Sequence, residues 1–241
     1  MSKKYELTSE TQEENGETLY RIKALRDFGD VKAGDLGGWV ESESNLDHVG
    51  DCWVSGDAEV SGDARVFDNA QVYGNARVFG DARVFGDAWL SGYARVFNNA
   101  QVYGYARVSG DAWLSGDARV FNNAQVYGDA RVFGDAEVSG DAWVYGDAQV
   151  FGDAWVFNNA QVYGDARVYK KSHIITFSGF GSLARTTTAF KTEASFHISC
   201  GCFKGTLEEF RAAISETHGD NKFGREYKLI AYLIELHFSE E

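Results

Sequence analysis

Cysteine and histidine side chains gather in one short stretch near the end of this 241-residue sequence. His197, Cys200 and Cys202 form the pattern H-x2-C-x-C, and His218 follows soon after. Imidazole and thiolate groups are the common ligands of structural zinc, but such a site needs about four ligands, and C-x-C alone is a weak zinc signature. Buried cysteines at a strand end explain the pattern equally well, so we predict no bound metal and no cofactor.

Histidine is also the commonest general base in enzymes, and its distribution argues against catalysis here. No histidine lies between Cys52 and Lys171; His48 precedes this stretch and His173 follows it. No phosphate-binding loop or nucleophile elbow is recognisable either. We therefore predict no catalytic residue and a protein that is not an enzyme. An alternative is a small-ligand site near the end of the stretch, lined by His173, His197 and His218.

These residues flank a repeat that accounts for half of the chain. From Cys52 to Lys171 the sequence repeats one hexapeptide twenty times, Ala-x-Val-(Phe/Tyr/Ser)-(Gly/Asn/Asp)-(Asp/Asn). Because side chains alternate along a strand, Ala and Val share one face, and x and the aromatic residue share the other. The last two positions favour a turn. We predict a stack of short strands with Val and Ala inside.

The repeat divides the chain into three predicted domains. Residues 1–51 are expected to form a β-hairpin, with strands at 5–8 and 18–25 around the turn signal Asn15-Gly16, followed by a glycine-rich cap. Residues 52–171 are the repeat. Residues 172–241 are a small α+β domain with strands near 173–177, 186–190 and 195–200, and then two helices. A capping box at Thr206 begins the first helix.

Three segments carry a resemblance to a known family: Ala24-Leu25-Arg26-Asp27-Phe28-Gly29-Asp30-Val31-Lys32-Ala33-Gly34, Gly37-Gly38-Trp39-Val40 and Gly50-Asp51-Cys52-Trp53-Val54. They resemble the YdcK-like hexapeptide-repeat proteins of bacteria, phages and prophages. The resemblance implies an all-β left-handed β-helix with triangular coils of 18 residues, and an acyltransferase label. The stretches Cys200-Gly201-Cys202-Phe203-Lys204-Gly205-Thr206 and Thr217-His218-Gly219-Asp220 resemble a small phage-type domain of unknown function.

An 18-residue coil sorts the outward side chains into three faces, and one face differs from the others. We call it the aromatic wall; its outward positions are Trp53, Gln71, Trp89, Arg107, Gln125, Trp143 and Gln161, with Ser55, Tyr73, Ser91, Ser109, Tyr127, Tyr145 and Tyr163. Only Arg107 is charged, whereas the other faces interleave Phe with Arg and Glu. Aromatic surfaces with few charges are typical of the centres of protein–protein interfaces. We therefore predict a contact surface at Trp53, Trp89, Trp143, Tyr73, Tyr127, Tyr145, Tyr163 and Gln125. The alternative is that these rings only stack on each other.

The net charge of −13 disfavours ordinary nucleic-acid binding. Rows of Asp at the corners could imitate phosphates or hold calcium, but local turn chemistry explains them. The polar start lacks the apolar segment of a signal peptide, no run is long enough to span a membrane, and three cysteines are too few for a disulfide scaffold. We expect a cytoplasmic protein that does not bind membranes.

The sequence thus predicts a non-catalytic β-solenoid scaffold or binding protein. We expect it to be phage or prophage encoded, to form homo-oligomers, with the trimer favoured, and to bind a host protein, as a counter-defence factor would. One alternative is a sponge that sequesters a small nucleotide-like signal. The other is an acyltransferase of the hexapeptide-repeat class.

Overall fold

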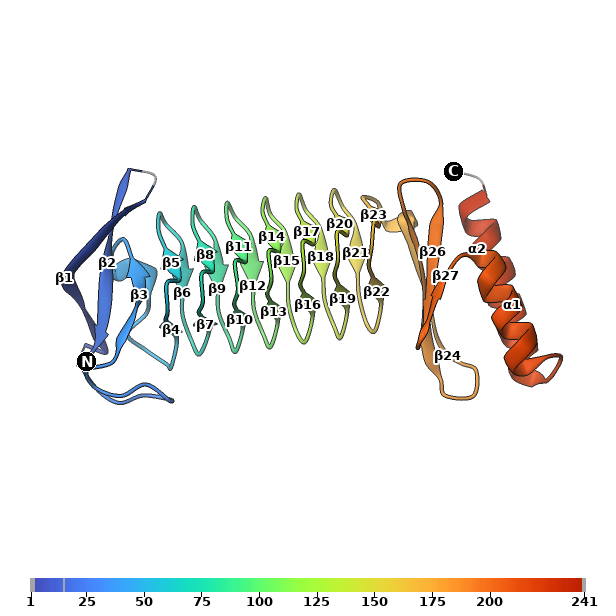
Figure 1. Ribbon diagram of the computed structural model, residues 1–241, viewed down its shortest axis with the longest axis horizontal. Helices are drawn as coiled ribbons and strands as arrows, with labels where there is room; N and C mark the ends of the chain where they lie inside the picture. Colours follow the sequence, from blue (N-terminus) through green and yellow to red (C-terminus); the bar gives the residue numbers. More distant parts are fainter. Residues whose placement is uncertain (1–2, 15, 240–241) are drawn as a thin grey trace.

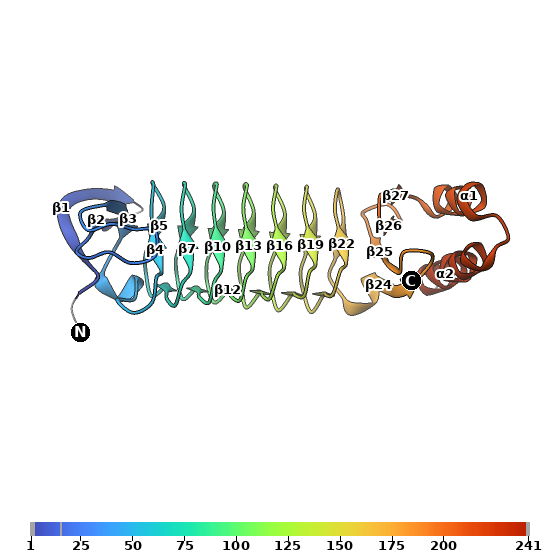
Figure 2. The same ribbon diagram turned by 90° about the horizontal axis from the view of Figure 1, so that it is seen from below.

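A computed structural model describes residues 3–14 and 16–239. An elongated stack of coils lies between a hairpin at one end and a sheet with two helices at the other (Figures 1 and 2). The two described ends of the chain therefore lie at opposite ends of the molecule.

Each coil contributes one two-residue strand to each of three parallel sheets, which confirms the three-sided solenoid with 18-residue coils. The seven-stranded sheet contains β4 (Trp53–Val54), β7 (Gln71–Val72), β10 (Trp89–Leu90), β13 (Arg107–Val108), β16 (Gln125–Val126), β19 (Trp143–Val144) and β22 (Gln161–Val162). The six-stranded sheet contains β6 (Arg65–Val66), β9 (Arg83–Val84), β12 (Gln101–Val102), β15 (Arg119–Val120), β18 (Glu137–Val138) and β21 (Trp155–Val156). The solenoid part of the ten-stranded sheet contains β5 (Glu59–Val60), β8 (Arg77–Val78), β11 (Arg95–Val96), β14 (Trp113–Leu114), β17 (Arg131–Val132), β20 (Gln149–Val150) and β23 (Arg167–Val168).

The interior of the solenoid is the predicted column of Val and Ala. From Val54 to Val168 the Val and Leu side chains of the repeat are fully buried, and the repeat Ala side chains are at most 1% exposed. Burial contributes roughly 1.5–3 kcal/mol for each such Val or Leu. The corners need a left-handed backbone: Gly110 has φ +71°, and a Cβ there would lie 2.8 Å from the nitrogen of Gly128. Asn122, which replaces glycine at one corner, keeps φ at 61°, a conformation that Asn tolerates.

The N-terminal hairpin continues the ten-stranded sheet and covers the first coil. β1 (Tyr5–Glu14) pairs antiparallel with β2 (Glu17–Ala24), and β3 (Leu36–Val40) pairs parallel with β5. The first strand is longer than the predicted 5–8; Gly16 of the predicted turn has φ +90°, and Asn15 lies outside the described residues. A short 3-10 helix, η1 (Glu43–Asn45), follows. The buried Lys4 donates a 2.8 Å hydrogen bond to the carbonyl oxygen of Cys52, where the repeat begins.

At the other end, a four-stranded antiparallel sheet stands between the solenoid and two helices (Figure 1). After η2 (Lys171–His173) it contains β24 (Ile174–Phe180), β25 (Arg185–Lys191), β26 (Phe196–Cys200) and β27 (Phe203–Gly205). Phe190 is fully buried in the solenoid core, while its neighbour Ala189 packs in the core beneath the helices. Alternation along β25 therefore gives one face of the sheet to the solenoid and the other to the helices.

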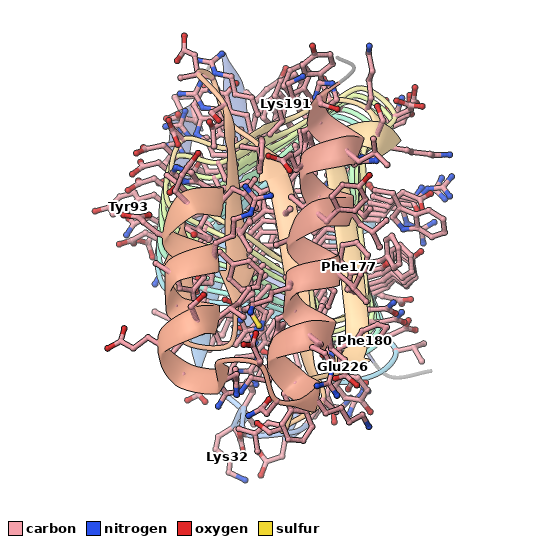
Figure 3. All side chains as sticks on the ribbon, turned by 90° about the vertical axis from the view of Figure 1, so that its right-hand side faces the viewer. Lys32, Tyr93, Phe177, Phe180, Lys191 and Glu226 are labelled. Carbon is pink, nitrogen blue, oxygen red and sulfur yellow. The ribbon has the colours of Figure 1, made fainter. Side chains whose placement is uncertain are left out.

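The helices form the outer layer at this end (Figure 3). α1 (Leu207–His218) begins with the predicted capping box, because Thr206 Oγ1 accepts from the amide of Glu209 and the Glu209 carboxylate accepts from the amide of Thr206. α2 (Lys222–Ser239) buries Tyr227, Ile230 and Ile234 as its apolar spacing predicts. Within residues 3–14 and 16–239, no helix is long and apolar enough to cross a membrane.

Candidate functional site

The outward face of the seven-stranded sheet is the aromatic wall. Its middle is open to solvent: Trp89 is 46% exposed, Trp143 39% and Tyr73 37%. Gln125 and Tyr127 lie between them and are half-buried. These five residues of the predicted contact surface share one continuous face. They are held there by strands whose Val and Leu side chains are locked in the core.

The start of the aromatic wall is covered by the N-terminal cap, which corrects the prediction for Trp53. Its indole is only 4% exposed and packs edge-on against the rings of Phe28, at 5.3 Å, and Tyr5, at 6.3 Å. Residues well before the repeat fold over this position. Trp53 is therefore part of the hydrophobic core and does not contribute to an exposed contact surface.

The end of the aromatic wall is partly covered as well, because the half-buried Tyr163 packs against the terminal sheet. Its ring meets Phe190 edge-on at 5.1 Å, and its hydroxyl donates a 3.4 Å hydrogen bond to the carbonyl oxygen of Ile198. Burial raises the pKa of Tyr163 to about 12. Tyr145 borders this junction: Lys204 donates a hydrogen bond to its hydroxyl, and the Lys204 ammonium lies 4.8 Å from the ring centroids of both tyrosines.

Outward rings on all three faces stack on the equivalent residue one coil away, as the ladder alternative predicts. Tyr127 and Tyr145 stack with centroids 5.0 Å apart, and Phe67 and Phe85 stack at 4.8 Å. Stacking and exposure are compatible, because a ladder buries the ring faces and leaves the ring edges free. The ladder therefore stiffens the aromatic wall without closing it.

The exposed tryptophans follow a second rule that only the structure reveals. Trp89 leans on Tyr73 in an edge-on contact at 6.1 Å, and Trp143 leans on Tyr127 in the same way at 6.3 Å. In both cases the partner precedes the tryptophan by sixteen residues, which places it in the previous coil. On the six-stranded sheet the equivalent partner of Trp155 is Ser139, which accepts a 3.4 Å hydrogen bond from the indole nitrogen.

The ladder of the aromatic wall is interrupted by a depression of about 280 Å³, which we call the notch. Ser91 and Ser109 occupy two successive rungs, with Tyr73 before them and Tyr127 after them. Trp89 and Arg107 also line the notch, and the Arg107 guanidinium lies 5.5 Å from the indole centroid. The pair of serines at an 18-residue spacing was visible in the sequence, but the contact prediction did not use it.

The predicted junction site is not formed, because the structure separates its three histidines. His173 is 1% exposed, and its ring meets that of Tyr169 edge-on at 3.9 Å. His197 lies on the solenoid side of the terminal sheet, 6.5 Å from the ring of Tyr163. His218 lies on the helix side, where it stacks on Tyr227 at 5.6 Å. The sheet stands between His218 and the other two, so the three imidazoles do not converge on one ligand.

The cysteines of the H-x2-C-x-C pattern point to different surroundings. Cys200 is buried beneath the helices, where its sulfur accepts a 3.2 Å hydrogen bond from Thr187, whereas Cys202 is exposed in the next turn. Across the described parts of the chain, no group of three or more His, Cys, Asp and Glu side chains is placed to hold a metal ion.

A cavity of about 520 Å³ lies where the N-terminal hairpin meets the solenoid, and sequence reasoning did not find it. Arg77 bridges two carboxylates there, with 2.5 Å to Glu14 and 3.1 Å to Glu59. Burial raises the pKa of Glu59, and the charge of Arg77 opposes that shift. The amide of Gln12 donates a 3.0 Å hydrogen bond to Glu59. These contacts hold the hairpin against the coils, and this structural role explains why the charged groups are there.

Comparison with known proteins agrees with the repeat architecture. The sequence profile described as "YdcK Beta solenoid repeat" matches residues 58–74, 70–84, 76–92, 100–116, 112–128, 124–140 and 160–174. No curated protein matches the sequence significantly. A crystal structure from Bacillus cereus described as a "putative acetyltransferase" aligns over 81% of this chain and 90% of its own, with 8% identity and a TM-score of 0.28. A likeness at this level says nothing about activity.

Proposed function

We propose that this protein, whose coils match the YdcK beta-solenoid repeat in seven stretches, is a binding protein without enzymatic activity, and that the open middle of the aromatic wall is its contact surface. The observation that carries the proposal is the exposure of Trp89, Trp143 and Tyr73 on one face of a rigid solenoid. The scaffold keeps these large rings exposed to water, so a partner that covers them lowers the free energy of the complex.

The composition of this surface supports contact with a protein. Trp and Tyr are enriched among the residues that dominate binding energy, and charged residues are depleted at the centre of interfaces. Arg107 is the single charge among the outward positions of the wall. The proposed partner is a second copy of this chain or another protein. A phage or prophage origin, a host target and a counter-defence role remain predictions from the sequence.

The rival proposal is the acyltransferase of the hexapeptide-repeat class. It would need a general base from outside the coils, since the sequence places no histidine between Cys52 and Lys171. His173 is buried against Tyr169, and His48 stacks on Tyr5 at 4.4 Å within the N-terminal cap. Turnover of acetyl-CoA by the purified chain would support the rival and overturn the binding proposal.

The direct test is the double substitution Trp89→Glu with Tyr127→Glu. It places two carboxylates in the open wall, and we expect the affinity for the partner, or for a second copy, to fall at least about tenfold, the range of one interface hot spot. Light scattering gives the mass in solution, and affinity capture gives the retained proteins.

The matched control is Trp155→Glu with Tyr103→Glu, on the six-stranded sheet. It makes the same change in charge and in ring number on a different face, and we expect it to leave mass and capture unchanged. Equal behaviour of the two double variants, with both folded by circular dichroism, contradicts the assignment of the contact surface.

A further inference from the structure

The notch is a gap of two rungs in an otherwise stacked column of rings. Successive rings in this column lie 5.0 Å apart where Tyr127 meets Tyr145. Tyr73 and Tyr127 are three rungs apart, which is about 14 Å at the usual spacing between strands. The side chains between them, Ser91 and Ser109, are too small to fill this distance. Both tyrosines line the depression between them.

A gap elsewhere in the ladders is closed by a tryptophan from the next coil. On the ten-stranded sheet Ser115 also interrupts the column of rings, but the neighbouring Trp113 leans back on Phe97 at 6.1 Å. On the six-stranded sheet Trp155 closes the gap at Ser139, and the serine is only 6% exposed. Ser139 thus shows how a tryptophan from the next coil can close a gap in a ladder.

The notch lacks such a filling side chain. The positions sixteen residues after Ser91 and Ser109, from which a tryptophan would lean over them, are Arg107 and Gln125. Both line the notch, and neither is aromatic. About 280 Å³ is left open between Tyr73 and Tyr127.

Charge around the notch favours a single anion. The Arg107 guanidinium forms no ion pair and donates no hydrogen bond to any residue within 3–14 or 16–239, so its five donors are free for a ligand. In the first nineteen units of the repeat the corner positions are Asp or Asn with two exceptions, Tyr93 and Tyr105. Tyr93 follows Ser91 by two residues and Tyr105 precedes Arg107 by two, so the exceptions stand at opposite edges of the notch coils, 59% and 65% exposed. Figure 3 shows Tyr93 projecting outward from its corner.

From these observations we propose that the notch binds a planar aromatic ring that carries one anionic group, the chemistry of a nucleoside monophosphate. The ring stacks in the gap of the ladder and the anion pairs with Arg107. The inference rests on the proposed function and deepens it, because it names a ligand class for the middle of the same wall.

Size and charge select a mononucleotide over a nucleic-acid strand. A volume of about 280 Å³ lies at the lower end of small-ligand sites, which suits one ring system. A strand would carry many phosphates past a protein with a net charge of −13, which repels them. One phosphate at the unpaired Arg107 guanidinium of the notch avoids this repulsion.

Isothermal titration of the full chain tests the proposal with three probes: adenosine monophosphate, adenosine and ribose 5-phosphate. We expect adenosine monophosphate to bind most tightly and ribose 5-phosphate not to bind. Arg107→Gln should weaken adenosine monophosphate roughly tenfold or more, the range of a charge-assisted hydrogen bond, and leave adenosine unchanged. Arg83→Gln, the same change on the six-stranded sheet, is the matched control and should have no effect.

Ser109→Tyr tests the gap itself. The new ring would stack on Tyr127 as Tyr127 stacks on Tyr145, so the chain should keep its melting temperature and lose both ring-containing probes. Ser91→Tyr is the second variant should the first fail to fold. The inference is overturned if ribose 5-phosphate binds as tightly as adenosine monophosphate, if the filled notch still binds the nucleotide, or if the native chain binds no nucleotide at millimolar concentration. A native chain that captures its partner but binds no nucleotide overturns only this inference, whereas unchanged capture by Trp89→Glu with Tyr127→Glu overturns the proposed function.

Discussion

The covered ends of the aromatic wall and its open middle carry the same kinds of side chain in the same repeat position. Trp53 at one end is 4% exposed, whereas Trp89 and Trp143 in the middle are 46% and 39% exposed. All three occupy the x position of a hexapeptide and point away from the Val interior. What differs is the chain that folds over them, since residues before the repeat cover Trp53.

The comparison teaches that an outward ring in a solenoid has no fixed role. At the ends, Trp53 joins the hydrophobic core and the half-buried Tyr163 packs against it. In the middle, the same ring types are available to a partner. The terminal structures thus seal the ends of the stack, where strand edges and apolar interior would otherwise be exposed, and they leave the centre of the wall free.

The largest expected effect separates the two regions directly. Trp53→Ala should lower the free energy of unfolding by about 3–5 kcal/mol, the usual cost of deleting a buried tryptophan. Trp143→Ala should cost about 1 kcal/mol, since it loses mainly an edge-on ring contact with Tyr127. Urea denaturation followed by circular dichroism measures both. If the two substitutions lower the free energy of unfolding by similar amounts, burial of Trp53 under the N-terminal cap does not stabilise the protein more than the exposed contact of Trp143 does.

A smaller effect concerns the border between the two regions. Lys204 reaches from β27 across the rings of Tyr145 and Tyr163. Because this ammonium is exposed, Lys204→Met should cost only about 0.5–1 kcal/mol. A double-mutant cycle with Tyr145→Phe isolates the contact between Lys204 and Tyr145. A coupling energy near zero would show that this contact does not help to hold the terminal sheet on the solenoid.

The smallest effect is a dependence on pH at the covered end. Burial raises the pKa of Tyr163 from its ordinary value to about 12. A raised folded-state pKa gives stability that is fully present below pH 10 and is lost as the pH rises towards 12. Between these values the native chain should lose stability relative to Tyr163→Phe, measured by urea denaturation at each pH. Parallel curves for the two proteins would contradict the burial of this hydroxyl.

The sequence predicted the solenoid well because each repeat specifies its own surroundings. Val at every sixth position can be buried only if the chain turns at every corner, and Gly, Asn and Asp supply those turns. The two helices near the end could be predicted equally well, since the capping box at Thr206 and the apolar spacing of Tyr227, Ile230 and Ile234 are local features. The short strand β27 was missed, because three residues carry too little pattern.

The candidate site was predicted only in part. The wall itself follows from the 18-residue period, but the buried Trp53 was placed on its surface, and His173, His197 and His218 were assigned to one junction. These errors share a cause: the residues that cover or separate them lie far away in the sequence. The ion pairs of Arg77 with Glu14 and Glu59 had no sequence signature for the same reason.

The sequence alone therefore determined the interior and the repeat geometry of this protein, because strand alternation and turn preference act between near neighbours. Only the tertiary structure decided which outward rings meet solvent. That choice depends on contacts such as Phe28 with Trp53 and Phe190 with Tyr163, which form after distant segments fold over the ends. It also depends on how far each side chain leans along the stack, as Trp155 reaches back to Ser139 while Arg107 and Gln125 leave the notch open.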